Sequence, residues 1–166
     1  MTKNIVLIGM PASGKSTIGV ILAKTIKYRF VDTDLLLQEA TDQTLTETIA
    51  QRGLKGFLQL ENDIVSKLNA SRTVIATGGS VIYGPEAMEH LKQQGVVVYL
   101  RHRYEVIESR LTNITTRGVA MREGQTLYDL YQERTPLYER YADLILEADG
   151  LTTEQTVQKL RDLLMK

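Results

Sequence analysis

The chain has 166 residues, a length that suits one domain with a sizeable hydrophobic core. Its 20 basic and 20 acidic side chains cancel, so composition gives no support for a nucleic-acid or anionic-membrane partner. The absence of cysteine excludes disulfides, thiolate catalysis and cysteine-bound metals, and the two histidines, His90 and His102, are too far apart in sequence to favour a zinc site. No apolar run is long enough to cross a bilayer, so we expect a cytoplasmic protein without a signal peptide.

The first predicted elements are a buried strand at 5–8 and an amphipathic helix after residue 17. Between them the sequence reads Gly-Met-Pro-Ala-Ser-Gly-Lys-Ser-Thr, which fits the pattern G-x-x-x-x-G-K-[ST]. Between a strand and a helix this pattern predicts a phosphate-binding loop (P-loop), because the loop amides and the helix N-terminus converge on one anion. Lys15 would reach the β- and γ-phosphates, and the Ser16 hydroxyl would ligate Mg²⁺. The candidate nucleotide-binding residues in this loop are Gly9, Ala12, Ser13, Gly14, Lys15, Ser16 and Thr17.

The rest of the chain alternates strands and helices, with no internal repeat or linker. Further strands are predicted at 29–32, 73–77, 96–100 and 144–146, and helices at 35–40, from 44 to near Gly53, and at 55–68, 85–94, 104–111, 127–141 and 153–165. Pro136 would either start a second helix or kink the first. The alternation predicts a single α/β domain over 1–166, in which helices cover both faces of a five-stranded parallel sheet. Residues 112–125 lack periodicity and are predicted to form a mobile lid.

In parallel sheets, ligands bind outside the carboxyl ends of the strands. This rule selects residues 9–17, 32–34, 77–80, 101–103 and 147–152 as candidate site segments. The segment after the second strand holds two carboxylates. Asp34 could orient an acceptor hydroxyl and take its proton late in a phosphoryl transfer, and Asp32 could hold Mg²⁺ through water. Alternatively, Asp34 caps the helix that follows it.

Other candidates lie after the third strand and in the second half of the chain. Gly78 and Gly79 would let an acceptor substrate approach the backbone, or would simply form a tight turn. Arg117, or Arg122 in its place, could close over the transferring phosphoryl group from the lid. Arg110 could stack on adenine, although a solvent-facing helix arginine fits as well. Arg134 lies among Tyr128, Tyr131, Tyr138 and Tyr141, whose spacing favours core and lid packing.

Taken together, these motifs resemble the shikimate kinase family over nearly the whole chain. The P-loop, the Asp32-Thr33-Asp34 sequence and the Arg134-Thr135-Pro136-Leu137-Tyr138 sequence match family motifs in order. The resemblance implies a fold like that of the nucleoside monophosphate kinases, with acceptor-binding helices at about 33–62. It also implies that Asp34 handles the acceptor hydroxyl, that Arg110 lies beside adenine and that Arg117 is the lid arginine.

The sequence departs from the family pattern at the acceptor end. The family has Phe-Arg-x-x-Glu where this chain has Phe57-Leu58-Gln59-Leu60-Glu61, and the family arginine joins the later one in gripping the shikimate carboxylate. Ser80 replaces the last glycine of a glycine triplet, and Gly118-Val119 replaces the Pro-Leu that normally follows the lid arginine. The loss of one charge-assisted hydrogen bond would weaken binding roughly 10- to 150-fold. Leu58 could also simply pack on the sheet while another cation supplies the charge.

We therefore expect a Mg²⁺- and ATP-dependent kinase of a small-molecule alcohol, with shikimate as the leading acceptor and a role in aromatic amino acid biosynthesis. The catalytic candidates are Lys15, Asp34 and Arg117, and the acceptor-binding candidates are Asp34, Phe57, Leu58, Gly78, Gly79 and Arg134. The alternatives are a kinase of the same fold for another hydroxylated acid or polyol, and a nucleotide-binding module without acceptor chemistry. We expect a monomer without nucleic-acid or membrane partners.

Overall fold

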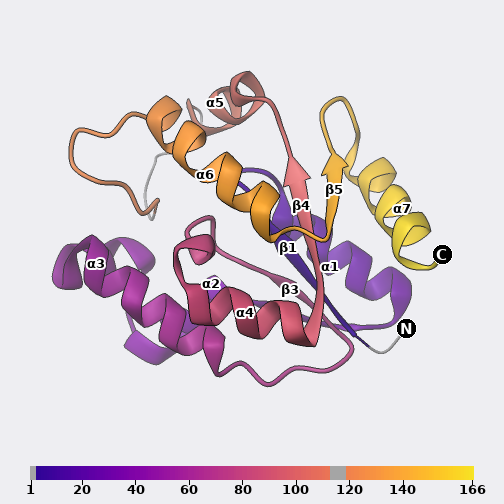
Figure 1. Cartoon of the computed structure of the whole chain (residues 1–166), viewed down its shortest axis with the longest axis horizontal. Coiled ribbons are helices and arrows are strands. Elements are labelled where there is room, and N and C mark those ends of the chain that lie inside the picture. Colours follow the sequence, from indigo (N-terminus) through magenta and orange to yellow (C-terminus); the bar gives the residue numbers. More distant parts are fainter. Residues whose placement is uncertain (1–2, 113–118) are drawn as a thin grey trace.

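A five-stranded parallel sheet forms the centre of the computed structural model, which describes residues 3–112 and 119–166 (Figure 1). The strands are β1 (Asn4–Ile8), β2 (Arg29–Asp32), β3 (Thr73–Ala76), β4 (Gly95–Arg101) and β5 (Leu144–Glu147). Their order across the sheet is β2-β3-β1-β4-β5, and each neighbouring pair runs parallel. The carboxyl ends of the strands therefore meet at one edge, as predicted.

The described helices cover this sheet and begin or end close to the predicted positions. They are α1 (Lys15–Ile26), α2 (Thr33–Thr41), α3 (Leu45–Ser66), a 3₁₀ turn (Val81–Tyr83), α4 (Pro85–Gln94), α5 (Tyr104–Thr112), α6 (Leu127–Tyr141) and α7 (Thr153–Leu164). Capping boxes formed by Thr44, Thr126 and Thr152 start α3, α6 and α7. Within residues 3–112 and 119–166, no helix combines the length and apolar character that a membrane crossing needs.

Two details of the helices answer questions that the sequence left open. At Gly53 the backbone has φ 74°, which interrupts α3 where a break was predicted. Pro136 does not start a second helix, because α6 runs continuously from Leu127 to Tyr141 with the proline inside it.

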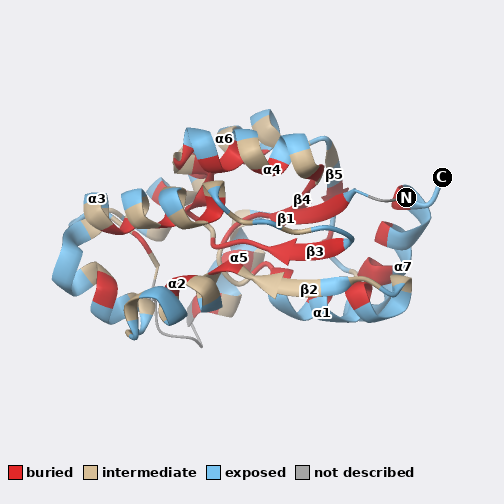
Figure 2. Ribbon diagram, turned by 90° about the horizontal axis from the view of Figure 1, so that it is seen from below, coloured by how far each residue is buried: buried red, intermediate tan, exposed pale blue. Residues whose placement is uncertain are grey.

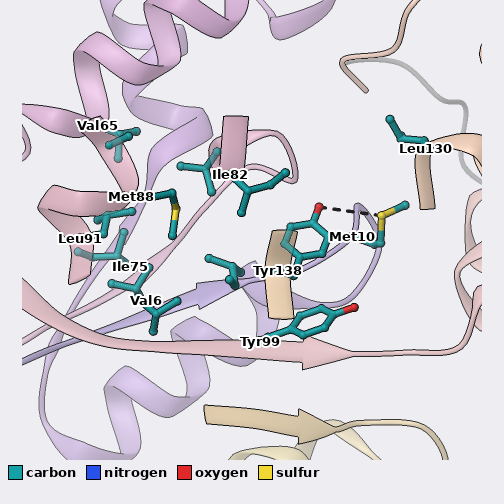
Figure 3. Close-up of a cluster of buried hydrophobic side chains, with 14 of the residues drawn as sticks. Val6, Met10, Val65, Ile75, Ile82, Met88, Leu91, Tyr99, Leu130 and Tyr138 are labelled. Atoms are coloured by element: carbon teal, nitrogen blue, oxygen red, sulfur yellow. Dashed lines mark hydrogen bonds between the residues drawn. The ribbon is translucent and has the colours of Figure 1, made fainter. Parts of the chain in front are cut away.

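Alternating residues of the sheet build two cores on its opposite faces (Figure 2). On one face, Val6 and Ile8 of β1 belong to a cluster with side chains of α4, α5 and α6. Figure 3 shows part of this cluster, in which Tyr138 of α6 packs against Tyr99 of β4 with ring centroids 5.1 Å apart. On the other face, Ile5 and Leu7 pack against α1 and α7. The result is the predicted three-layer α/β/α arrangement.

A third and smaller cluster lies apart from both faces of the sheet. It consists of Leu37 from α2, Phe57 from α3 and Ala120, with partly buried apolar neighbours that include Leu58. In Figures 1 and 2, α2 and much of α3 extend beyond the sheet on one side. These helices cover the region predicted to bind the acceptor; α2 packs on α3, and α3 also packs extensively on α4.

Candidate active site

The P-loop curls around the N-terminus of α1 and points its carbonyl groups at cationic side chains. Gly14 has φ 90°, a conformation that favours glycine, and it leads the loop into the helix. The Lys15 ammonium donates to the carbonyl oxygens of Gly9 (2.7 Å) and Met10 (2.8 Å) and to Ser13 Oγ (3.2 Å). Burial lowers the pKa of Lys15 to about 8, although the neighbouring Asp34 carboxylate opposes this shift.

The hydroxyl of Ser16 and a carboxylate oxygen of Asp32 meet beside the loop, with Ser16 Oγ donating to Asp32 Oδ2 at 2.7 Å. Both are hard oxygen donors, the type that Mg²⁺ prefers. Among the described residues no group of three histidine, acidic or cysteine side chains could hold a metal by itself. The pair nevertheless fits Mg²⁺, because this ion usually takes one or two protein oxygens and completes its shell with phosphate and water.

Asp34 faces the cavity next to the P-loop, and it does not cap α2. The cap is Asp32, whose Oδ1 accepts a hydrogen bond from the Asp34 amide at 2.9 Å, so the helix begins at Thr33. The cavity holds about 350 Å³ and is lined by Pro11, Ala12, Gly14, Lys15, Ser16, Thr17, Asp34, Leu45, Phe57, Thr77, Gly78, Gly79, Ser80, Leu111, Val119, Ala120 and Arg134. Burial, with the nearby Asp32 carboxylate, raises the pKa of Asp34, and Lys15 opposes the rise.

Gly78 and Gly79 are required by close packing, and neither has the positive φ of a glycine-dependent turn. A β-carbon on Gly78 would lie 2.7 Å from Asp34 Oδ1 and 2.9 Å from Glu61 Oε2. A β-carbon on Gly79 would lie 2.9 Å from Arg134 Nη1. These two glycines therefore allow two carboxyl groups and a guanidinium to approach the floor of the cavity.

Arg134 is a buried cation in this cavity, with 1% of its surface exposed. Its Nη2 donates to the carbonyl oxygen of Ala120 at 2.6 Å, and its guanidinium lies over the ring of Tyr83, 5.5 Å from the centroid. Its Nε has no hydrogen-bond partner. Since a buried donor without a partner is costly, the guanidinium of Arg134 is the candidate group in this cavity for an anionic ligand.

Glu61 lies behind the cavity lining, next to Gly78 and Ser80, and the sequence assigned it no role. It lies on α3, four residues after Phe57 and so on the same helix face, and 2% of its surface is exposed. Its Oε1 accepts a hydrogen bond from Ser80 Oγ at 2.6 Å, whereas its Oε2 has no partner. Burial raises its pKa from the usual 4.5 to about 7, although the Ser80 hydroxyl opposes the rise.

This pKa predicts a pH-dependent cost of burying Glu61. Because the folded pKa is higher than the unfolded one, the contribution of Glu61 to stability is greatest below about pH 4.5 and is lost as the pH rises through about 7. When the pH is raised from about 5 to about 8, the native chain should therefore lose roughly 1–3 kcal/mol more unfolding free energy than Glu61→Gln loses. Urea unfolding at both pH values measures this difference. The exposed Glu39→Gln is the control, and equal pH dependence in Glu61→Gln and the native chain would contradict the assignment.

Leu58 lies beside the main cavity and does not line it, although it was predicted to be an acceptor-binding position. Its half-buried side chain packs in the third cluster and lines a neighbouring, mostly apolar cavity together with Leu54, Tyr83 and Ala120. Leu58 therefore packs against apolar side chains, but in the third cluster and not on the sheet, where the alternative for this residue placed it. Phe57, by contrast, lines the main cavity as predicted.

The remaining candidate arginines occupy different places. Arg110 donates from Nη1 to the carbonyl oxygen of Ala12 at 3.0 Å and lines a separate cavity behind the P-loop. Arg122 pairs with Glu133 at 2.6 Å, outside the main cavity. Arg117 lies outside the described residues, as does part of the predicted lid, and its role stays a prediction.

A P-loop, a carboxylate beside it and a buried cation across one cavity define a kinase site on a nucleotide-binding α/β fold. The family model described as "Shikimate kinase" matches residues 11–165. The chain belongs to the shikimate kinase family, whose members are ATP-dependent kinases that act on an alcohol group.

Individual relatives agree with this assignment. The shikimate kinase of Thermodesulfovibrio yellowstonii is 37% identical over 161 residues, which cover 95% of this chain and 92% of the relative. The shikimate kinase of Francisella tularensis subsp. holarctica is 35% identical over 169 residues, which cover 99% and 96%. Among solved structures, the shikimate kinase of Acinetobacter baumannii in complex with shikimate has a TM-score of 0.89 and 31% identity, and the match covers 98% of this chain and 93% of that one.

Proposed function

We propose that the protein transfers the γ-phosphoryl group of ATP to a hydroxyl of shikimate. The observation that carries the proposal is one cavity that holds the Lys15 ammonium, the Asp34 carboxyl group and the buried Arg134 guanidinium. Lys15 serves the phosphate donor, Asp34 the attacking hydroxyl and Arg134 an acceptor carboxylate. The relative solved with shikimate, at 31% identity, supports this choice of acceptor.

In the proposed reaction, the acceptor oxygen attacks the γ-phosphorus and the bond to the β–γ bridging oxygen breaks. Asp34 holds the acceptor hydroxyl in line and receives its proton as the new bond forms. Lys15 leaves the loop carbonyls and offsets the charge on the β- and γ-phosphates. Ser16 and Asp32 would hold Mg²⁺, which neutralises phosphate charge when bound. Arg117 would close over the transferring group, and Arg110 would lie on the adenine side.

A panel of acceptors in a coupled assay of ADP release tests the proposal. We expect magnesium-dependent turnover with shikimate that exceeds the rate with water alone. Rapid turnover only on another hydroxylated acid or polyol would replace shikimate as the acceptor but keep the reaction type. Tight ATP binding with no acceptor-stimulated ADP release would instead favour a non-catalytic nucleotide-binding module.

The altered acceptor end supports one alternative, a kinase of the same fold for a different small hydroxylated acid or polyol. Lys15 and Arg134 are the cationic side chains that the described structure places in the cavity lining, and Leu58 packs elsewhere. The unpartnered Oε2 of Glu61 adds a hydrogen-bond acceptor next to Gly78, which lines the cavity. This combination suits a ligand with one anionic group and several hydroxyl donors.

Leu58→Arg tests how far the missing cation limits shikimate use. An arginine at 58 lies three residues before Glu61 on α3, a spacing that brings the two side chains together. We expect the KM for shikimate to fall about tenfold, since a charge-assisted hydrogen bond contributes about 1.5–3 kcal/mol. Leu58→Met, which keeps the volume and adds no charge, is the control. Unchanged kcat/KM in the arginine variant would show that residue 58 does not limit acceptor binding.

We further propose that the chain works as a single-domain monomer in the cytoplasm, without nucleic-acid or membrane partners, and that it serves aromatic amino acid biosynthesis. Its net charge of zero gives no general attraction to nucleic acid or anionic membranes. Light scattering at the protein concentration of the assay tests whether the protein is a monomer.

A further inference from the structure

A buried hydrogen bond joins Ser80, in the turn after β3, to Glu61 on α3. Ser80 Oγ donates to Glu61 Oε1 at 2.6 Å, and the two residues are 5% and 2% exposed. Within residues 3–112 and 119–166, this hydroxyl is the one donor that reaches the carboxyl group, since Glu61 Oε2 has no partner. The position of a buried acidic side chain therefore depends on a single serine.

This hydrogen bond links two positions at which the chain departs from the family pattern. The pattern has an arginine at position 58, three residues before Glu61, a helical spacing that brings two side chains together. At position 80 it has a glycine, which offers no hydroxyl. In this chain Leu58 offers no donor, whereas Ser80 does. The two exchanges together thus replace an arginine by a serine as the available partner of Glu61.

A donor is needed at this place because Glu61 is deeply buried. A buried acidic group that loses its partner keeps the cost of desolvation without the compensating contact. Leucine at position 58 combined with glycine at position 80 would leave both carboxyl oxygens of Glu61 in that state. Serine at position 80 removes this cost at Oε1.

The turn that contains Ser80 also approaches the groups assigned to the acceptor. A β-carbon on Gly78 would lie 2.9 Å from Glu61 Oε2 and 2.7 Å from Asp34 Oδ1, so the two carboxyl groups meet over this glycine. A β-carbon on the next glycine would lie 2.9 Å from Arg134 Nη1. Three successive residues of one turn therefore contact the acidic pair and the buried guanidinium.

The charge of Glu61 acts on the same groups. Burial raises the pKa of Glu61 to about 7; the Ser80 hydroxyl opposes the rise, Asp34 adds to it, and the cations Arg134 and Lys15 oppose it. Ser80 thus stabilises the carboxylate form of Glu61. That carboxylate repels the charge of Asp34 and attracts the guanidinium of Arg134, so a change in its position or charge alters both.

We propose that Ser80 is a specificity-determining residue that acts through Glu61, because its hydroxyl holds the Glu61 carboxyl group in place of the missing cation at position 58. The inference deepens the proposed function and rests on it, since Asp34 and Arg134 are assigned there to the acceptor. Without this hydrogen bond the Glu61 side chain would take up a proton or turn toward Arg134. Either change weakens acceptor binding and leaves the ATP site intact.

A double-mutant cycle tests whether Ser80 acts through Glu61. Steady-state kinetics with shikimate are measured for the native chain, Ser80→Ala, Leu58→Arg and the double variant. With leucine at position 58, we expect Ser80→Ala to raise the KM for shikimate about tenfold, because Glu61 loses its donor. With arginine at position 58, the same change should raise it about twofold or less, since the guanidinium supplies a donor. The KM for ATP should stay within about twofold throughout.

Direct contact of Ser80 with the acceptor is the competing explanation, because Ser80 also lines the main cavity. Direct contact predicts the same fold increase in KM with either residue at position 58, and this additive result would overturn the proposal. An unchanged KM in Ser80→Ala would also overturn it. Ser71→Ala, at an exposed serine, is the matched control and should leave the KM unchanged in both backgrounds.

Urea unfolding of the same four proteins separates specificity from a purely structural role. A stability loss in Ser80→Ala that Leu58→Arg reverses, without the matching effect on KM, would show a structural role only and overturn the proposal. Ser80→Gly, which restores the residue of the family pattern, is a second variant with the same expectations. If neither variant folds with either residue at position 58, the proposal fails, because the arginine then does not replace the hydroxyl.

Turnover of the native chain is measured first, so that the two proposals fail in different experiments. If the native chain uses another acceptor and not shikimate, the proposed acceptor is wrong and the cycle is measured with the acceptor that it uses. If it uses no acceptor, the proposed function fails in the native protein. Failure of the role of Ser80 appears only in the comparison between the two backgrounds.

Discussion

Asp34→Asn should lower kcat for the acceptor reaction by about 10²- to 10⁴-fold, the usual contribution of a positioned general base. The asparagine keeps the size of the side chain and can still accept a hydrogen bond from the hydroxyl, but it cannot take the proton. ADP affinity should stay within a few-fold of the native value, because the phosphate site is formed by the P-loop. Steady-state kinetics with an ADP-release assay and calorimetry with ADP separate the two effects.

The pH profile gives this prediction a second readout. Because burial raises the pKa of Asp34, the native enzyme should lose activity on the acid side at a higher pH than an ordinary aspartate would cause. Asp63→Asn, a change at an exposed position of α3, is the control and should keep native kcat. Activity of Asp34→Asn within tenfold of the native value would remove Asp34 from the chemistry.

Lys15→Met should reduce kcat/KM for ATP by roughly 10²- to 10³-fold, as expected for loss of one preorganised charge at the transferring group. In the structure, the ammonium is held by the carbonyls of Gly9 and Met10, so it must exchange these contacts for phosphate oxygens when ATP binds. Methionine fills the same space without the charge. Steady-state kinetics at saturating acceptor and varied ATP measure this change in kcat/KM.

Lys15→Arg distinguishes charge from position. With its pKa lowered to about 8, Lys15 in the free protein loses its charge as the pH rises through 8, and ATP use should decline over this range. Arginine stays charged there, so the decline should be absent in Lys15→Arg even if its activity is lower throughout. A native-like kcat/KM for ATP in Lys15→Met would refute the role of Lys15.

The sheet and its helices were predictable because their signals are local. Apolar strand segments alternate with segments of helical periodicity, and the predicted bounds of each strand lie within one residue of those in the structure. The helix cap at the end of β2 was less predictable. Asp32 and Asp34 both suit an N-cap by residue type, and only the helix start at Thr33 decides for Asp32.

The site was predictable where it depends on strand ends, and less so where it depends on packing between elements. The strand-end rule placed the P-loop, Asp34 and Gly78 at one edge, and the cavity brings them together. The pairing of Glu61 with Ser80 depends on how α3 packs beside the end of β3, which no local pattern specifies. The available signals for Glu61 were its helical spacing of four from Phe57 and its match to the glutamate of the family motif.

His102 Nδ1 lies 2.9 Å from Asp149 Oδ1, and this contact illustrates the same limit. The strand-end rule selected both segments, 101–103 and 147–152, but it could not join them. The pairing of β4 with β5 aligns Arg101 with Glu147, which brings the residues that follow each strand alongside one another. Register between strands distant in sequence is a tertiary property, so the contact between His102 and Asp149 could not be predicted before the sheet was known.

The separation of the third cluster from the two sheet cores bears on how this enzyme can diverge. Leu37, Phe57 and Ala120 pack away from the sheet, and Leu58 lies among their neighbours. Because the two sheet cores, and not this cluster, pack against the strand that leads into the P-loop, we expect exchanges in the third cluster to reshape the neighbouring cavities while the nucleotide loop keeps its place. The leucine at 58 is an exchange of this kind relative to the family pattern.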